Sequence, residues 1–96
     1  MMQFSKELRD DVAAGAITVT FRLWQRPQVK VGGRYRVGLT TIAVDSVEAV
    51  PFGQITAADV RRAGERDREA LQARAAHAGP IADDTPLYRI AFHVVG

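Results

Sequence analysis

The residues with the clearest chemical potential lie in one short stretch, residues 17–24, where polar and apolar side chains alternate. Successive side chains of a β-strand point to opposite faces, so a strand here gathers its polar members into a single row. The row contains two hydroxyls, a guanidinium and an indole, from Thr18, Thr20, Arg22 and Trp24. Guanidinium groups suit phosphates and base edges, and indole rings suit stacking on unpaired bases. The pattern therefore favours a binding surface for a nucleotide or for RNA.

The segment around this strand is locally basic. Between Val12 and Val44 the chain has five Lys or Arg residues and no Asp or Glu; besides Arg22 these are Arg26, Lys30, Arg34 and Arg36. The first of them adds a cation beside Trp24, and the other three flank the Gly32-Gly33 turn, where they can follow a phosphate backbone by charge. Structural alternatives stay open: a cross-strand carboxylate for Arg22, packing over a barrel end for Trp24, and ordinary surface charge for the rest.

Residues suited to metal or acid–base chemistry are few. The chain has no Cys, and its two histidines, His77 and His93, have no metal-ligand spacing around them. Asp83 and Asp84 are typical of solvated loop carboxylates. No glycine pattern for dinucleotide binding is present. The sequence thus predicts no metal site, no cofactor and no catalytic residue in the leading interpretation.

Local signals divide the chain into short helices and strands that would position these residues. N-cap candidates, apolar spacing and Gly stops indicate helices, and alternation with β-branched residues indicates strands. They predict helices over residues 5–14, from the N-cap Thr56 to Gly64, and over 67–78, and strands over 17–24, 34–37, 41–50 and 87–95. Gly38 should separate the second and third strands, and a bulge is expected near Ser46. The first strand should bury Ile17, Val19, Phe21 and Leu23.

The order of these elements decides the fold class. A helix, about three strands, two short helices and a final strand contain no repeated βα unit, which disfavours a doubly wound parallel sheet. Short strands with Gly and Pro turns favour a small curled sheet. We therefore expect an α+β fold, namely a small mixed β-barrel with about three short helices covering one opening.

Composition agrees with one globular domain. The 96 residues are 47% hydrophobic and 25% charged, with a net charge of +2, which is typical of a folded, soluble chain. The absence of Cys excludes disulfides and fits a reducing compartment. No apolar run approaches the ~20 residues of a membrane span. We expect a cytoplasmic protein with no membrane partner.

Several segments together resemble the ASCH domain family of PUA-like proteins. They span nearly the whole chain and are Phe4–Trp24, Val29–Gly32, Tyr35–Gly38, Ile55-Thr56 and Leu87–Phe92. The resemblance implies a single PUA-like barrel over residues 1–96, with a ligand cleft beside the first strand. The marked positions of the family pattern GxKxxExR fall here on Gly15, Ile17, Thr20 and Arg22, so the Gly and the Arg match.

The remaining two positions bear on enzymatic activity. A Thr at the Glu position is similar to the small bacterial ASCH amidohydrolases that act on acetylcytidine, in which it is the proposed nucleophile alongside the Lys. Here Ile17 stands at the Lys position. A Thr hydroxyl is a weak nucleophile without a neighbouring base or cation, and no sequence register brings Glu65 or Asp67 to Thr20.

Three functional hypotheses result. The leading one is an RNA- or nucleotide-binding module that uses a basic cleft beside the first strand, with RNA or a nucleotide-like ligand as partner. The first alternative is an amidohydrolase that acts on an acylated nucleoside such as acetylcytidine, with Thr20 as nucleophile. The second alternative is a protein-interaction domain that uses an exposed strand edge.

Overall fold

Short helices and four strands make up the part of the chain that the computed structural model describes, residues 4–76 and 79–95. The elements are α1 (Lys6–Ala13), β1 (Val19–Arg22), β2 (Arg34–Val37), β3 (Thr40–Pro51), the 3-10 helix η1 (Phe52–Gln54), α2 (Ala57–Arg62), α3 (Arg68–Ala75) and β4 (Pro86–Val94). Their order is the predicted one. The predicted first strand is shortened at both ends, and residues 77 and 78 of the predicted third helix lie outside the described residues.

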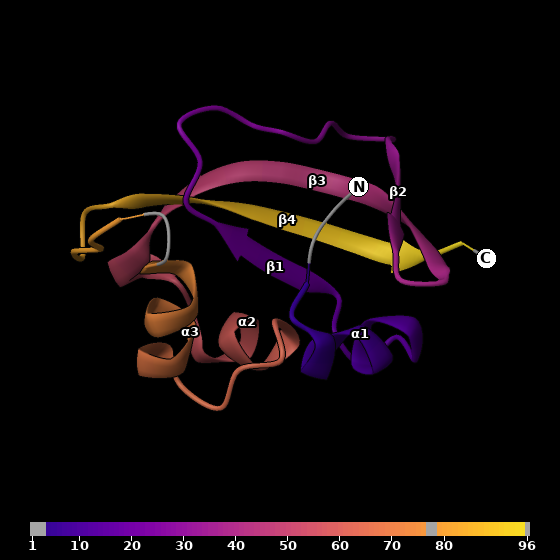
Figure 1. Cartoon of the computed structure of the whole chain (residues 1–96). Coiled ribbons are helices and arrows are strands. Elements are labelled where there is room, and N and C mark those ends of the chain that lie inside the picture. Colours follow the sequence, from indigo (N-terminus) through magenta and orange to yellow (C-terminus); the bar gives the residue numbers. More distant parts are fainter. Residues whose placement is uncertain (1–3, 77–78, 96) are drawn as a thin grey trace.

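The four strands form one antiparallel sheet in the order β1-β4-β3-β2. The expectation of a mixed, closed barrel is therefore wrong in two respects. All the pairings are antiparallel, and β1 and β2 lie at opposite edges of an open sheet. Each edge strand is four residues long, and no pairing joins β1 to β2 among the described residues. The α+β class is correct, and Figure 1 shows the three helices gathered below β1 while the segment between β1 and β2 passes above the sheet.

The longest strand, β3, connects the two parts of the sheet. It pairs with β2 through its first four residues and with β4 along most of its length. Gly38, at a φ of +60°, forms the tight turn that separates β2 from β3. The register shifts between Val44 and Ser46, so the bulge predicted near Ser46 is confirmed. A bulge increases the local twist of a strand. This bulge lies where β3 continues beyond the residues that pair with β2 and goes on pairing with β4.

Apolar side chains pack on both faces of the sheet. The first cluster joins α1 to one face and contains Phe4, Leu8, Val12, Ile17, Val29, Val37, Ile42, Val44, Ile90 and Phe92. The second joins η1, α2 and α3 to the other face and contains Val19, Phe21, Phe52, Ile55, Val60, Ala63, Leu71 and Leu87. Strand β4 contributes side chains to both clusters, because its residues 90 and 92 belong to the first cluster and residue 87 belongs to the second.

Because both faces of the sheet are covered, the alternation in β1 does not separate a core face from a solvent face. Val19 and Phe21 are buried as predicted, whereas Ile17 belongs to the other cluster and Leu23 is only half-buried. Thr20 pairs with Ile90 in the ladder, so its side chain shares the face of the first cluster, and only 8% of it is exposed. The polar row of β1 therefore points into the protein and not to an open sheet surface.

The helix starts are set by side-chain caps at two of three positions. Thr56 accepts a hydrogen bond from the Asp59 backbone N–H at 3.1 Å, which confirms the predicted N-cap of α2. Asp67 caps α3 in the same way, through the Ala70 N–H at 2.8 Å. Ser5 precedes α1 as predicted but makes no such cap; its hydroxyl has a different partner, described below.

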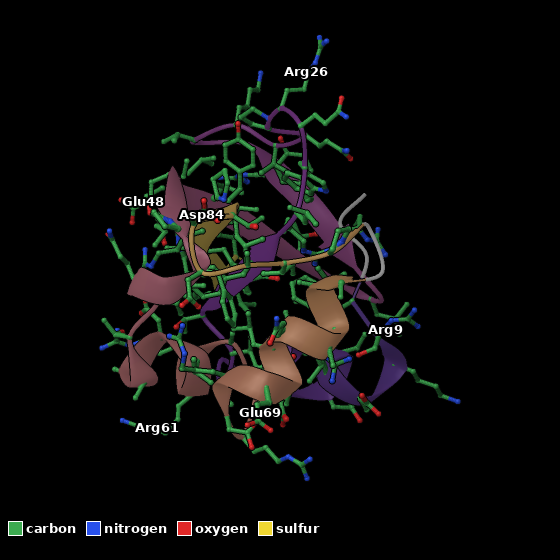
Figure 2. All side chains as sticks on the ribbon, turned by 90° about the vertical axis from the view of Figure 1, so that its left-hand side faces the viewer. Arg9, Arg26, Glu48, Arg61, Glu69 and Asp84 are labelled. Carbon is green, nitrogen blue, oxygen red and sulfur yellow. The ribbon has the colours of Figure 1, made fainter. Side chains whose placement is uncertain are left out.

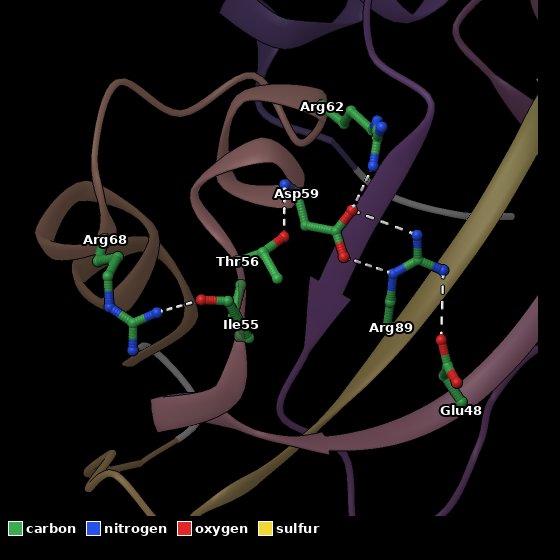
Figure 3. Close-up of polar contacts among 7 residues, drawn as sticks. All are labelled: Glu48, Ile55, Thr56, Asp59, Arg62, Arg68 and Arg89. Atoms are coloured by element: carbon green, nitrogen blue, oxygen red, sulfur yellow. Dashed lines mark hydrogen bonds and ion pairs between the residues drawn. The ribbon is translucent and has the colours of Figure 1, made fainter.

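A polar cluster fixes α2 against the sheet (Figure 3). Asp59 in the first turn of α2 accepts hydrogen bonds from Arg89 Nε at 2.7 Å and from Arg62 Nη1 at 2.9 Å. Arg89 comes from β4 and also reaches Glu48 of β3 at 3.3 Å. The hydrogen bond from Arg89 lowers the pKa of the Asp59 carboxyl, and the same contact raises the pKa of Arg89. A helix and two strands are thus joined through one guanidinium.

Arg68 fixes α3 to the segment that leads into α2. Its Nη2 donates to the Phe52 carbonyl at 2.7 Å, its Nη1 donates to the Ile55 carbonyl, and its guanidinium lies 4.7 Å from the centre of the Phe52 ring. The Phe52 carbonyl also accepts the Ile55 N–H at 3.2 Å, so the arginine adds a second donor there and ties α3 to this segment. No helix among residues 4–76 and 79–95 is long and apolar enough to cross a membrane.

Replacing Asp59 with Asn should lower the free energy of unfolding by about 1–3 kcal/mol near neutral pH, because charge-assisted hydrogen bonds to Arg89 are lost. The folded-state pKa of Asp59 is lowered, so the contribution of its carboxylate is present above the unfolded-state pKa and is lost as the pH falls through the folded-state pKa. Urea unfolding of both proteins should show a difference that is constant above about pH 5 and shrinks below about pH 4.

The control for this measurement is Glu69→Gln, which removes an exposed carboxylate from α3 (Figure 2) and should change the free energy of unfolding by less than about 0.5 kcal/mol. A difference between wild type and Asp59→Asn that persists or grows on acidification would contradict the assignment.

Candidate functional site

A cavity of ≈ 470 Å³ lies between β1, α1 and α3. Its aromatic lining comes from Phe4, Phe21 and Trp24, and its polar lining from Ser5, Thr20, Arg22, Glu65 and Arg74. Residues 20–24 of one strand and its extension therefore form one wall, and the two helices with the turn before α3 form the others. This is the place where polar side chains from distant parts of the sequence converge.

Arg22 lies against the aromatic floor of the cavity without a carboxylate partner. Its guanidinium carbon is 4.8 Å from the centre of the Phe4 ring, and its Nε donates to the Thr20 hydroxyl at 3.1 Å. Within residues 4–76 and 79–95 it forms no ion pair, and Nε is the only one of its nitrogens that has a hydrogen bond. Burial lowers the pKa of the guanidinium. A partly desolvated cation with unused N–H donors is suited to an anionic or acceptor group of a ligand.

Trp24 both packs and lines the cavity. It is half-buried against the first apolar cluster, and its ring centre lies 6.3 Å from that of Tyr88 at an interplanar angle of 38°. One part of the indole is therefore held by the protein while another faces the cavity. A ring held in this way loses little freedom on contact with a planar ligand.

The opposite wall contains an ion-paired network centred on Arg74 of α3. Arg74 Nε donates to Glu65, its Nη1 donates to the Ser5 hydroxyl at 2.7 Å, and its Nη2 contacts Glu7 at 3.0 Å. The hydrogen bond to Glu65 raises the pKa of Arg74. Glu65 is only 8% exposed, and the guanidinium of Arg74 compensates the negative charge of this buried carboxylate. The network connects α3 to the start of α1 across the cavity mouth.

Gly64 directs Glu65 into this wall. Its φ is +82°, and a Cβ at this position would lie 2.5 Å from Ile17 Cδ1, so only Gly fits. The Glu65 N–H donates to the Val60 carbonyl at 3.1 Å and completes the end of α2. The predicted helix stop at Gly64 is confirmed, and the next residue is turned back toward β1.

The residues proposed from sequence fall into two groups. Thr20, Arg22 and Trp24 line the cavity, while Thr18 is half-buried below it, with its backbone bonded to Arg62 and Phe92. The remaining four are exposed and line no part of it: Arg26, Lys30, Arg34 and Arg36. Figure 2 shows Arg26 at the tip of the β1–β2 segment, pointing away from the molecule.

The charge of the cavity differs from the basic cleft that was expected. Its charged lining consists of two guanidiniums and one carboxylate, and one of the guanidiniums is already paired. Among the residues that the structure describes, Arg22 is thus the one charge of the lining without an oppositely charged partner. Ser5 and Arg74 were not anticipated as cavity residues, and Glu65 had been considered only as a base without a known direction; the contacts that bring them together join residues up to 69 positions apart.

The two histidines considered as metal ligands are His77 and His93. His93 Nδ1 lies 2.9 Å from Asp45 Oδ1, an exposed pair between β4 and β3, and His77 lies outside the described residues. In the part of the chain that the structure describes, no three His, Asp or Glu side chains come together as metal ligands.

Comparison with known proteins identifies the fold. No family model and no curated protein matches the sequence. An ASCH domain from Lactobacillus crispatus JV V101 superposes with a TM-score of 0.76, at 19% sequence identity over 92% of this chain and 70% of the other. The chain has an ASCH-like fold. A DUF984 protein from Enterococcus faecalis V583 is also similar, with a TM-score of 0.69 at 17% identity over 93% of this chain and 67% of the other.

The ASCH-like fold confirms the resemblance that the sequence suggested. At these identities the likeness concerns the arrangement of the backbone, so the roles of individual side chains have to be argued from their own contacts. In this ASCH-like domain those contacts single out Arg22 as the one cation of the cavity lining that has no acidic partner among the described residues.

Replacing Arg74 with Met should lower the free energy of unfolding by about 1–3 kcal/mol, because the nearly buried Glu65 carboxylate loses its cation and α1 loses its contact with α3. Arg66→Met is the control, since the Arg66–Asp67 pair is exposed and 3.7 Å long and should contribute less than about 0.5 kcal/mol. Chemical denaturation of the two variants measures both effects, and equal effects would contradict a structural role for the network.

Proposed function

We propose that this ASCH-like domain binds a nucleotide, or an unpaired nucleotide of an RNA, in the cavity between β1, α1 and α3. The observation that carries the proposal is Arg22, a half-buried guanidinium that faces the cavity and is paired with no carboxylate among the described residues. Removing a cation from water is costly unless a partner compensates for the loss. A phosphate, or an acceptor on a base edge, supplies that compensation.

The size and lining of the cavity fit a ligand of this kind. Its volume of ≈ 470 Å³ falls within the ~300–1,000 Å³ that is usual for small-molecule sites. The aromatic walls offer stacking surface to a planar base, and the Thr20 hydroxyl and the Glu65 carboxylate add hydrogen-bonding groups. One uncompensated charge, beside an ion pair and aromatic groups in the same lining, favours a single nucleotide unit over a continuous stretch of polyanion.

The exposed basic residues after β1 extend the proposal to a longer RNA. Arg26 and Lys30 lie on the segment that follows Trp24, where they would meet phosphates on either side of a nucleotide held in the cavity. Contacts of this type depend strongly on salt, because counterions are released from the nucleic acid on binding. The cavity contact itself involves one guanidinium and should depend on salt much less.

The contacts around Thr20 do not favour the amidohydrolase alternative. The hydroxyl accepts a hydrogen bond from Arg22, no basic group in the described residues accepts its proton, and Glu65 is held by Arg74. Ile17, at the position of the family's Lys, is buried in the first apolar cluster. Arg22 is a cation beside the hydroxyl, but a guanidinium cannot accept the hydroxyl proton. Activation of Thr20 as a nucleophile would also require a base that does, so we expect no release of cytidine from acetylcytidine.

The test uses the fluorescence of Trp24, the only Trp of the chain. Titration with single nucleotides and with a short single-stranded RNA should change the emission. Arg22→Ala should weaken nucleotide binding about tenfold or more, equivalent to about 1.4 kcal/mol, and Arg22→Lys should restore it only in part because it lacks the planar fork. Raising the salt concentration should affect the RNA more than the nucleotide.

Arg61→Ala is the matched control, because Arg61 is exposed on α2 and points into solvent in Figure 2. It should bind as wild type does. Unchanged affinity in Arg22→Ala, or no binding of any nucleotide or RNA at low salt, would contradict the proposal. Hydrolysis of acetylcytidine by the wild type that is lost in Thr20→Ala would favour the enzyme.

A further inference from the structure

The outer edge of β2 is a second surface with unused binding groups. Among residues 4–76 and 79–95, β2 ends the sheet on one side and pairs with β3 alone. The Val44 N–H donates to the Gly33 carbonyl at 2.9 Å, and backbone groups in an antiparallel ladder alternate between facing the partner and facing away. Continued along the register, this places the N–H and C=O groups of Tyr35 and Val37 toward β3.

The backbone groups of Arg34 and Arg36 therefore point outward. Within residues 4–76 and 79–95 neither residue takes part in a backbone hydrogen bond outside the sheet. Each presents one N–H donor and one C=O acceptor, at the spacing that a further extended strand requires. Figure 1 shows β2 at the far end of the sheet from the paired α2 and α3.

The side chains along this edge are basic in the middle and apolar at both ends. Arg34 and Arg36 are exposed and, being two residues apart, project from the same face. Neither forms an ion pair within the described part of the chain; Asp45, on the neighbouring strand, is bonded to His93 instead. Val31 before β2 is 63% exposed and Leu39 after it is 96% exposed, and they are the two large exposed hydrophobic residues found among the described ones.

We propose that the free edge of β2 binds an extended, acidic segment of a partner protein, which joins the sheet as a fifth strand. The main-chain groups of Arg34 and Arg36 would pair with the backbone of that segment, and their guanidiniums would pair with Asp or Glu residues at alternate positions. Apolar residues at the two ends of the segment would cover Val31 and Leu39.

Several observations favour a peptide over RNA at this edge. Phosphates can pair with the two guanidiniums, but a nucleic acid backbone has no N–H donors to match the outward carbonyls. A nucleic acid also gains little from covering Leu39, whereas an apolar side chain gains about 25 cal/mol for each Å² buried. The edge shares no residue with the lining of the cavity, so this inference stands or falls independently of nucleotide binding.

The experiment uses the full chain labelled with ¹⁵N and a synthetic peptide of Leu, four alternating Glu and Thr residues, and Leu. Adding the peptide should shift the amide signals of Arg34 and Arg36 and slow their hydrogen exchange, because these N–H groups become bonded. A peptide with Lys in place of Glu, and a peptide with N-methylated Glu residues, should both bind at least about tenfold more weakly, since the first reverses the charge and the second removes the backbone donors that face Arg34 and Arg36.

Two variants separate the contributions of the basic and the apolar side chains. Arg34→Gln combined with Arg36→Gln should weaken peptide binding about tenfold, and Leu39→Ser should weaken it severalfold. All three positions are exposed, so the variants should unfold at the denaturant concentration of the wild type. Arg22→Ala, which is expected to lose nucleotide binding, should bind the peptide as the wild type does.

Three results would overturn the proposal. Slow exchange of the Arg34 and Arg36 amides in the free protein would mean that the edge is already paired. Absence of binding by the Glu peptide would mean that the two arginines only protect the edge against association. Shifts of these amides with single-stranded RNA but not with the peptide would assign the edge to nucleic acid.

Discussion

Burial of both faces of the β1–β4 pair is the constraint on which the rest of the molecule depends. In a sheet with one solvated face, the polar residues of an alternating strand meet water. Here α1 and the loop after β1 cover one face and η1, α2 and α3 cover the other. The polar row of β1 that begins at Thr20 consequently points into the protein. Because β1 alternates between two apolar clusters, a chain of 96 residues forms a cavity with polar groups in its lining.

The buried and half-buried charges are of two kinds, those paired with an opposite charge and those without such a partner among the described residues. Asp59 with Arg89, and Glu65 with Arg74, are oppositely charged pairs that hold helices against strands or against each other. Such pairs tolerate desolvation because each charge compensates the other. In the described structure the guanidinium of Arg22 has one hydrogen bond, to a hydroxyl, and one cation–π contact, to an aromatic ring. A cation–π contact offsets a small part of the cost of burial. An unmatched cation in a cavity is therefore the feature that stability alone does not explain.

Local features of the fold were readable from the sequence because their causes are local. The Thr56 cap depends on residues three positions apart, the bulge near Ser46 follows from a slip in alternation, and Gly64 marks a helix end through its own backbone. The cavity was only half predictable. Thr20, Arg22 and Trp24 share one strand and its extension, so their convergence follows from strand geometry. The contact between Ser5 and Arg74 joins residues 69 positions apart, and such a contact leaves no periodic signal in the sequence. Closure of the barrel failed as a prediction for a related reason, because it depends on whether the whole sheet curls enough to bring β1 and β2, its two edges, together.

The positive charges that form one segment in the sequence lie in separate places in the structure. Read along the chain, Arg22 to Arg36 form one basic segment, and a single polyanionic partner is the simplest interpretation. In three dimensions the segment turns away after Trp24, so one guanidinium lies in a nearly neutral cavity while the others lie on an exposed loop and on an outer strand. Desolvated charges bind through short, directional hydrogen bonds that salt screens weakly, and exposed charges act through a field that falls off within about 8–10 Å at physiological salt. The spacing of basic residues in the sequence therefore does not define one site, and the guanidinium of the cavity and those of the β2 edge would attract an anion by different physical means.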